Sequence, residues 1–163
     1  MQTILKVKDV TKNYNKNQKP SLQKVSFNVK AGEFIGIMGA SGSGKTTLLN
    51  VLSTIDKPTS GEIYINGVDL RGLSDAASAD FRRDYLGFIF QEYFLLDSLT
   101  IRENIAVPLT LQKLSPKKIE KLVKSLAERF GIASQLDKYP SELSGGQRQR
   151  ASAARAIVKK PSI

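Results

Sequence analysis

The chain has no cysteine and no histidine among its 163 residues. The absence of cysteine excludes disulfide bonds and thiolate metal sites, and it is compatible with a reducing compartment. No uncharged apolar run approaches the roughly 18 residues that a membrane-spanning helix requires. The first six residues also lack the apolar core of a secretory signal peptide. We therefore expect a soluble chain in the cytoplasm.

The net charge of +10 raises the possibility of a nucleic-acid partner. Residues 143–163 contain five basic residues and no acidic residue, so half of the excess lies in one short segment. The chain has no basic stripe rich in aromatic residues, which is what stacks the bases of single strands. A solvated basic face is therefore expected, and binding to nucleic acid is a minor alternative that a strong salt dependence would support.

The segment Gly39-Ala40-Ser41-Gly42-Ser43-Gly44-Lys45-Thr46 matches the phosphate-loop pattern G-x-x-x-x-G-K-[ST] at every fixed position. Glycines let backbone N–H groups turn toward a ligand, and at a helix N-terminus such donors can cradle a phosphate. Lys45 supplies a mobile positive charge for phosphates, and the Thr46 hydroxyl can ligate Mg²⁺.

The surroundings of this loop agree with the motif. The apolar run 34–38 predicts a buried strand before the loop, and residues 47–52 continue as a helix after it. Kinases, GTPases and transport ATPases all use such a loop, so the loop alone does not name a family. Asn15-Lys16-Asn17-Gln18 lacks the aspartate of a guanine motif, which disfavours GTP.

The patterning predicts an α/β nucleotide-binding core followed by a helical part. Strands are expected at 3–10, 22–29, 34–38, 62–65 and 86–90, with a loop at 13–20 and a hairpin turn at Asn66-Gly67. Helices are expected at 47–52, 75–84, from 101, from 116 to about Gly131, and from about Ser144 to 158. The start after Thr100 reads as an incomplete capping box, with asparagine in place of the acidic residue.

A second candidate anion site is Ser144-Gly145-Gly146, where the last helix begins. Small residues at a helix N-terminus leave its N–H groups open to an anion. Alone, the same residues would read as a flexible loop capped by serine. Here Leu143 precedes them, Gln147 follows, and a phosphate loop lies upstream.

With these residues the chain resembles the ATP-binding domain of ABC transporters. Leu143-Ser144-Gly145-Gly146-Gln147 is identical to the signature of that family, and Arg148-Gln149-Arg150 continues it in the same way. The resemblance covers the whole chain in the family's order. Tyr14 falls where an aromatic stacks on adenine, Gly39–Thr46 is the Walker A motif, and Gln91 is the Q-loop glutamine.

The resemblance implies an α/β P-loop NTPase core of the ABC type, with an antiparallel β-subdomain and a helical subdomain. Residues 1–91 would form the ATP-binding core and β-subdomain, and residues 92–163 the helical subdomain with the signature helix. The implied cofactors are ATP and Mg²⁺, the latter on Thr46 and Gln91. The implied nucleotide-binding residues are Tyr14, Gly39, Ala40, Ser41, Gly42, Ser43, Gly44, Lys45, Thr46, Thr47, Gln91, Ser144, Gly145, Gly146 and Gln147.

The resemblance also implies two protein partners. A second copy would bind head to tail, so that the signature of one copy contacts the γ-phosphate held by the other. An integral membrane permease would dock on the helical part and hold the protein at the inner face of the cell membrane. No nucleic acid is expected.

Within the family, residues 53–61, 81–84 and 86–91 look like the macrolide-exporter and lipoprotein-release branch, and most like bacitracin-type exporters of antimicrobial peptides. Relatives in lipoprotein release and cell division share much of this pattern and remain alternatives. The expected function is the coupling of ATP binding and hydrolysis to export.

The family's Walker B aspartate, catalytic glutamate and switch histidine follow the signature, and no residue of this chain matches them. No catalytic residue is therefore assigned here, and Gln91 has a supporting role. We expect residues 1–163 alone to be inactive in hydrolysis, because these groups are missing. We also expect them to be less stable than an intact domain, because a central strand would be missing. Two alternatives remain: the chain is a piece of a complete motor subunit, or it is a truncated module that only binds ATP. The gene sequence beyond codon 163 would distinguish them.

Overall fold

The computed structural model describes residues 2–15, 19–112 and 114–163. They form two compact units, one up to Arg82 and one from Arg83 onward, which are treated separately below. Met1 and residues 16–18 lie outside the described residues, so part of the expected loop at 13–20 and of the guanine-motif comparison does too. The division into functional subdomains at residue 91 stays a prediction.

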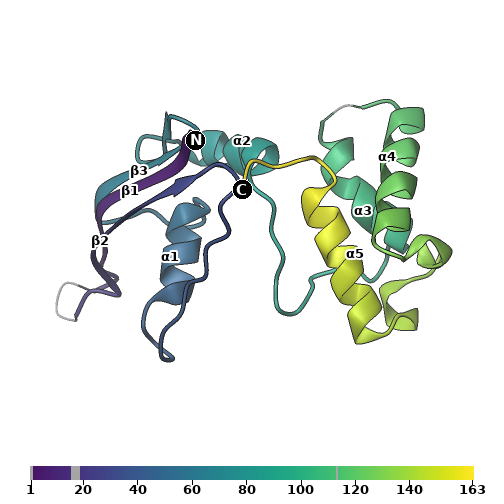
Figure 1. Ribbon diagram of the computed structural model, residues 1–163, viewed down its shortest axis with the longest axis horizontal. Helices are drawn as coiled ribbons and strands as arrows, with labels where there is room; N and C mark the ends of the chain where they lie inside the picture. The colour runs from purple at the N-terminus through teal and green to yellow at the C-terminus, as the bar shows by residue number, and fades with distance from the viewer. Residues whose placement is uncertain (1, 16–18, 113) are drawn as a thin grey trace. The chain divides into compact units, whose positions relative to one another are not determined.

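The first unit is built on an antiparallel sheet with the strand order β2-β1-β3-β4 (Figure 1). The bounds are β1 Thr3–Lys12, β2 Leu22–Lys30, β3 Ser60–Ile65 and β4 Val68–Asp69. On β1, Leu5 and Val7 are buried while Lys6 and Lys8 are exposed, which is the alternation of a strand with one face in a core. The strands expected at 3–10, 22–29 and 62–65 are confirmed.

The turn between β3 and β4 is made by Asn66 and Gly67, as expected. Both have positive φ angles, 49° and 80°. Two consecutive left-handed residues match the right-handed twist of the paired strands, and Asn-Gly tolerates that conformation best.

Two helices complete the first unit, α1 (Lys45–Leu52) and the first part of α2 (Asp75–Tyr85). Leu48 and Val51 are the buried residues of α1. Ser74 accepts a hydrogen bond on its hydroxyl from the Ala77 N–H at 3.2 Å, so it caps α2 as expected. Both predicted helices are confirmed, with boundaries shifted by one or two residues.

Two expected strands are wrong. Residues 34–38 and 86–90 lie in no strand. The side chains of Phe34 and Met38 are 99% and 92% exposed, which is the opposite of a buried strand. An apolar run becomes a strand only when a neighbour satisfies its N–H and C=O groups, and in the described part of the chain the sheet is β2-β1-β3-β4 alone.

The second unit is helical (Figure 1, green to yellow). Its elements are α3 Ile101–Thr110, α4 Pro116–Arg129, the short 3₁₀ turns η1 Ala133–Gln135 and η2 Pro140–Glu142, and α5 Gly145–Ile157. Helix α3 packs against both α4 and α5. Their shared core contains Ile101, Ile105, Leu109, Val123, Leu126, Ala127, Ile132, Leu136, Leu143, Ala151, Ala154 and Val158.

The start of α3 corrects one detail of the sequence interpretation. Thr100 accepts a hydrogen bond from the Glu103 N–H, and the Glu103 carboxylate accepts one from the Thr100 N–H at 2.8 Å. Glu103 is the third helical residue, so the capping box is complete, and the asparagine at position 104 has a different role.

Asn104 is fully buried and holds the segment before α3 in place. Its Oδ1 accepts a hydrogen bond from the Leu96 N–H at 2.7 Å, and its Nδ2 lies 3.0 Å from the carbonyl oxygens of Leu96, Leu99 and Thr100. Asn104→Ala would leave the Leu96 N–H and the Leu99 carbonyl without this partner, whereas the Leu96 and Thr100 carbonyls would keep the Leu99 and Asn104 N–H groups. We expect it to lower the free energy of unfolding by about 2–4 kcal/mol, measured by urea denaturation.

The matched control is Ser125→Ala, which changes an exposed polar residue of α4 in the same unit. It is expected to change stability by less than about 0.5 kcal/mol. Equal stability of the two variants would contradict the structural role of Asn104.

Candidate nucleotide-binding site

The loop before α1 adopts a conformation that needs glycine. Gly42 and Gly44 have φ angles of 78° and 90°, in the left-handed region that side chains disfavour. Gly44 is also the residue directly before α1, and a Cβ there would lie 2.4 Å from the Ser21 carbonyl oxygen. The close approach of this loop to β2 therefore requires glycine at position 44.

Lys45 carries the positive charge of this loop. Its Nζ donates hydrogen bonds to the carbonyl oxygens of Gly39 at 2.8 Å and Ala40 at 2.7 Å, and lies 3.4 Å from the Ser43 hydroxyl. The Lys45 ammonium group therefore lies against the backbone of the phosphate loop. The loop and the start of α1 border an open depression of about 320 Å³, lined by Ser21, Ser41, Gly42, Gly44, Lys45, Thr46 and Thr47.

These residues fit a polyphosphate. A helix N-terminus and a lysine ammonium both favour negative charge, and the glycines leave the backbone N–H groups accessible. Thr46 offers one hydroxyl oxygen, and no group of three histidine, cysteine, aspartate or glutamate side chains is clustered in the described residues. The donor set therefore fits a Mg²⁺ ion that keeps most of its ligands as phosphate oxygens and waters.

Tyr14 lies in the loop after β1, with its side chain 61% exposed. The Lys12 Nζ lies 4.7 Å from the centroid of the Tyr14 ring, which is a cation–π contact. The Tyr14 hydroxyl has Asp56 and Thr47 as neighbours, and the interaction with Asp56 is the largest cause of a raised pKa for Tyr14. The structure thus brings the expected aromatic next to α1, in the same unit as the phosphate loop.

Lys12 and Asp56 were missed by the sequence interpretation. The Lys12 Nζ lies 2.5 Å from Asp56 Oδ1. Burial alone would raise the pKa of Asp56, but hydrogen bonds from Lys12 and the Lys57 N–H, together with the neighbouring Tyr14, outweigh it and hold that pKa below its ordinary value. No local signal could have paired two residues that lie 44 positions apart.

The second expected anion site begins α5, as the sequence indicated. The Ser144 hydroxyl accepts a hydrogen bond from the Gln147 N–H at 3.3 Å, and Gln147 Oε1 accepts one from the Ser144 N–H at 2.9 Å. A Cβ on Gly145 or Gly146 would meet no atom closer than 3.8 Å, and neither residue has a positive φ. The internal structure of the unit therefore does not require these glycines, and their bare backbone is available to an approaching ligand.

Gln91 is exposed, and the chain just beyond it is held by α5. Tyr93 and Phe94 have φ angles of 60° and 43°, unusual for two bulky residues in succession. The Ser152 hydroxyl donates to the Tyr93 carbonyl at 3.1 Å. The Arg155 guanidinium donates to the carbonyls of Tyr93 at 2.8 Å and Phe94 at 2.5 Å. Burial lowers the pKa of Arg155, which stays a strong donor to these two oxygens.

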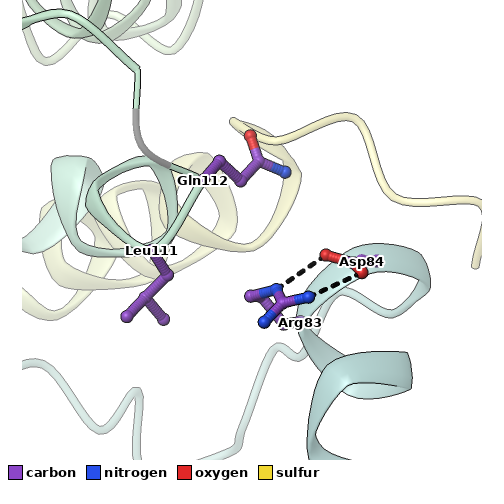
Figure 2. Close-up of a pocket in the computed structure, with 4 residues that line it drawn as sticks. All are labelled: Arg83, Asp84, Leu111 and Gln112. Atoms are coloured by element: carbon purple, nitrogen blue, oxygen red, sulfur yellow. Dashed lines mark hydrogen bonds and ion pairs between the residues drawn. The ribbon is translucent and has the colours of Figure 1, made fainter. Parts of the chain in front are cut away.

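The second unit has two further hollows away from the signature. Figure 2 shows one of about 390 Å³, where Arg83 and Asp84 form a two-point ion pair beside Leu111 and Gln112. Because the two charges compensate each other, this hollow does not offer a net charge to a phosphate. The other, of about 340 Å³, is mainly apolar and includes Phe88, Phe90 and Phe94 together with Val107 and Pro108.

The expected site residues fall in both units. Tyr14 and residues 39–47 belong to the first, whereas Gln91 and residues 144–147 belong to the second. It stays a prediction that Tyr14, residues 39–47 and Gln91 bind one nucleotide and that residues 144–147 contact the nucleotide of a second copy. The described residues form no helix with the length and apolar character needed to cross a membrane.

Comparison with protein families gives a match to the ABC transporter family model over residues 22–163. The chain is 51% identical over 162 residues to the bacitracin export ATP-binding protein BceA of Halalkalibacterium halodurans, covering 98% of this chain and 64% of that protein. It is 42% identical over 160 residues to the macrolide export ATP-binding/permease protein MacB of Shigella flexneri, covering 97% of this chain and 25% of that protein. The chain thus spans less than two thirds of the length of these relatives.

Among solved structures, the chain is similar to the ATP-binding cassette MJ0796 in a dimeric, post-hydrolysis state bound to ADP and Pi. The TM-score is 0.86 at 38% identity, covering 96% of this chain and 70% of that one. The expected resemblance, including the branch with bacitracin and macrolide exporters, is confirmed. The expected fold class, an α/β P-loop core of the ABC type, is confirmed as well.

Proposed function

Because this chain belongs to the ABC transporter family, we propose that it binds ATP with its phosphate loop and Tyr14. The observation that carries the proposal is the arrangement around α1. Lys45 and the left-handed Gly42 and Gly44 lie at the N-terminus of α1, and Tyr14 lies beside Thr47 in the first turn of that helix. An aromatic ring at that place suits a base whose phosphates lie on the loop. Mg²⁺ would supply charge neutralisation on those phosphates, with the Thr46 hydroxyl and Gln91 as ligands.

The proposal extends to a head-to-tail dimer. A signature site and a phosphate loop in one chain can each serve a different nucleotide when two copies face each other. The open backbone at Gly145 and Gly146 supports this, because nothing inside the unit contacts a Cβ at either position more closely than 3.8 Å. The similar cassette MJ0796 is described as dimeric with ADP and Pi.

In the intact protein the dimer would hydrolyse ATP and drive export through a membrane permease, which would hold it at the cytoplasmic face of the cell membrane. The likeness to a bacitracin exporter and a macrolide exporter supports export, with antimicrobial peptides as the proposed cargo. The apolar hollow lined by Phe88, Phe90 and Phe94 is a suitable contact surface for the permease. No nucleic acid takes part in this proposal.

ATP-dependent dimerisation tests the proposal directly. The purified intact protein is expected to be a monomer without nucleotide, and to form a dimer with Mg²⁺ and a slowly hydrolysed ATP analogue, measured by light scattering after gel filtration. ADP is expected to leave it monomeric, because the signature needs a γ-phosphate to contact. A monomer under all conditions, with ATP bound, would contradict the dimer and leave the binding assignment standing.

A further inference from the structure

The chain just before Tyr14 is fastened to the segment that follows α1. The Asn13 N–H donates to the Thr59 hydroxyl at 2.9 Å, and that hydroxyl lies 3.3 Å from the Asn13 carbonyl oxygen. The Thr59 N–H donates to the Thr11 carbonyl at 2.8 Å. The backbone that leads into the loop therefore has a fixed path up to the residue before Tyr14.

Lys12 occupies one face of the Tyr14 ring. Its Nζ is held by Asp56 Oδ1 at 2.5 Å and by the Lys57 carbonyl at 2.8 Å, and it lies 4.7 Å from the ring centroid. The Lys12 side chain is only 12% exposed, so solvent screens this cation little. With the cation tied to two oxygens, the ring has one covered face and one open face.

The hydroxyl end of the ring has protein neighbours as well. Asp56 and Thr47 are the side chains that act on the Tyr14 hydroxyl, where Asp56 raises its pKa and Thr47 lowers it. Thr47 follows Thr46 in α1, so the ring lies beside the helix whose N-terminus forms the phosphate loop. The position of the ring relative to that loop is therefore set by side chains, although Tyr14 itself lies in a loop.

We propose that Lys12 and Asp56 are positioning residues for the base of the bound nucleotide. Lys12 covers one face of the Tyr14 ring, and Asp56 holds Lys12 and lies beside the Tyr14 hydroxyl, so the remaining face is presented to the base. This inference rests on the proposed ATP binding and adds two residues that act through Tyr14.

The expected size of the effect follows from preorganisation. A tyrosine in an unrestrained loop samples several orientations, and the apparent affinity falls by the fraction of time that it spends in the competent one. Losing Asp56 would leave the ring free to turn away. We therefore expect Asp56→Asn and Lys12→Met each to weaken ATP binding about three- to tenfold, with Tyr14→Ala as the upper limit.

The experiment measures dissociation constants by calorimetry for two ligands with Mg²⁺, ATP and inorganic tripolyphosphate. Tripolyphosphate has no base, so Asp56→Asn and Lys12→Met should leave its affinity within about twofold of wild type. Asp69→Asn is the matched control, because it makes the same change in another ion pair of this unit, with Arg71 at 2.7 Å. It should bind both ligands like wild type.

A double variant and a spectroscopic measurement separate positioning from general damage. Adding Asp56→Asn to Tyr14→Ala should produce no further loss of ATP affinity, because the two act on one contact. Ultraviolet titration of tyrosine, with Tyr14→Phe subtracted, should show the pKa of Tyr14 falling toward its ordinary value of 10.0 in Asp56→Asn. Lys12, Asp56 and Thr47 are the groups that face its hydroxyl and ring.

Three results would overturn the inference. They are unchanged ATP affinity in both Asp56→Asn and Lys12→Met, an equal loss of ATP and tripolyphosphate, and a further loss in the Tyr14→Ala background. If wild type binds neither ligand, the proposed ATP binding itself fails, which is a distinct outcome. Lys12→Met keeps the test open if Asp56→Asn does not fold.

Discussion

Lys45→Ala is expected to weaken ATP binding by about 10- to 100-fold, which corresponds to the loss of one or two charge-assisted hydrogen bonds to phosphate. In the structure the ammonium group bonds to loop carbonyl oxygens at 2.7 and 2.8 Å. A flexible four-carbon stem lets it exchange these neutral partners for phosphate oxygens. Alanine offers no charge to make that exchange.

The measurement is calorimetric titration of the intact protein with ATP, with Lys8→Ala as the control. Lys8 is exposed on β1 and lies outside the depression at the loop. Lys45→Ala also removes the contacts that hold the loop together, so thermal unfolding should be recorded for both variants. Unchanged ATP affinity in Lys45→Ala would contradict the phosphate-loop assignment.

Gly146→Ala is expected to leave folding intact or slightly improved and to reduce ATP turnover by about 10- to 100-fold. A Cβ at this position would meet only Arg150 Nη1, at 3.9 Å, and the residue has no positive φ. Alanine inside a helix is favoured over glycine by about 0.5–1 kcal/mol. In the proposed dimer, the methyl group would instead occupy the space through which the other copy's γ-phosphate approaches.

The assay compares turnover in the intact protein with ATP binding by the monomer, and binding should change little. Gly72→Ala makes the same substitution at an exposed position with no atom within 4 Å of the added Cβ, and its turnover should stay normal. Equal losses of turnover and monomer binding in Gly146→Ala would contradict the role of the signature in a dimer.

Features that depend on neighbouring residues could be predicted from the sequence. The turn at Asn66-Gly67 and the start of α5 at Ser144 follow from which residues tolerate a left-handed backbone or accept a hydrogen bond from a free N–H group. The phosphate loop is equally local, because glycine and lysine spacing fixes its geometry.

The expected strands at 34–38 and 86–90 failed for a physical reason. Their composition is that of buried strands, but an apolar run does not specify its pairing partner, and pairing is what makes a strand. The network of Lys12, Tyr14 and Asp56 was missed for a related reason. Lys12 and Tyr14 precede α1 in the sequence and Asp56 follows it, so only the three-dimensional structure brings them together.

Arg155 and Ser152 hold the backbone at Tyr93 and Phe94 by hydrogen bonds, and this links that segment to the start of α5. The signature residue Ser144 begins the same helix whose later turns hold these two carbonyl groups. Because one helix carries all three residues, a displacement of α5 at Ser144 would also displace the donors that hold residues 93 and 94.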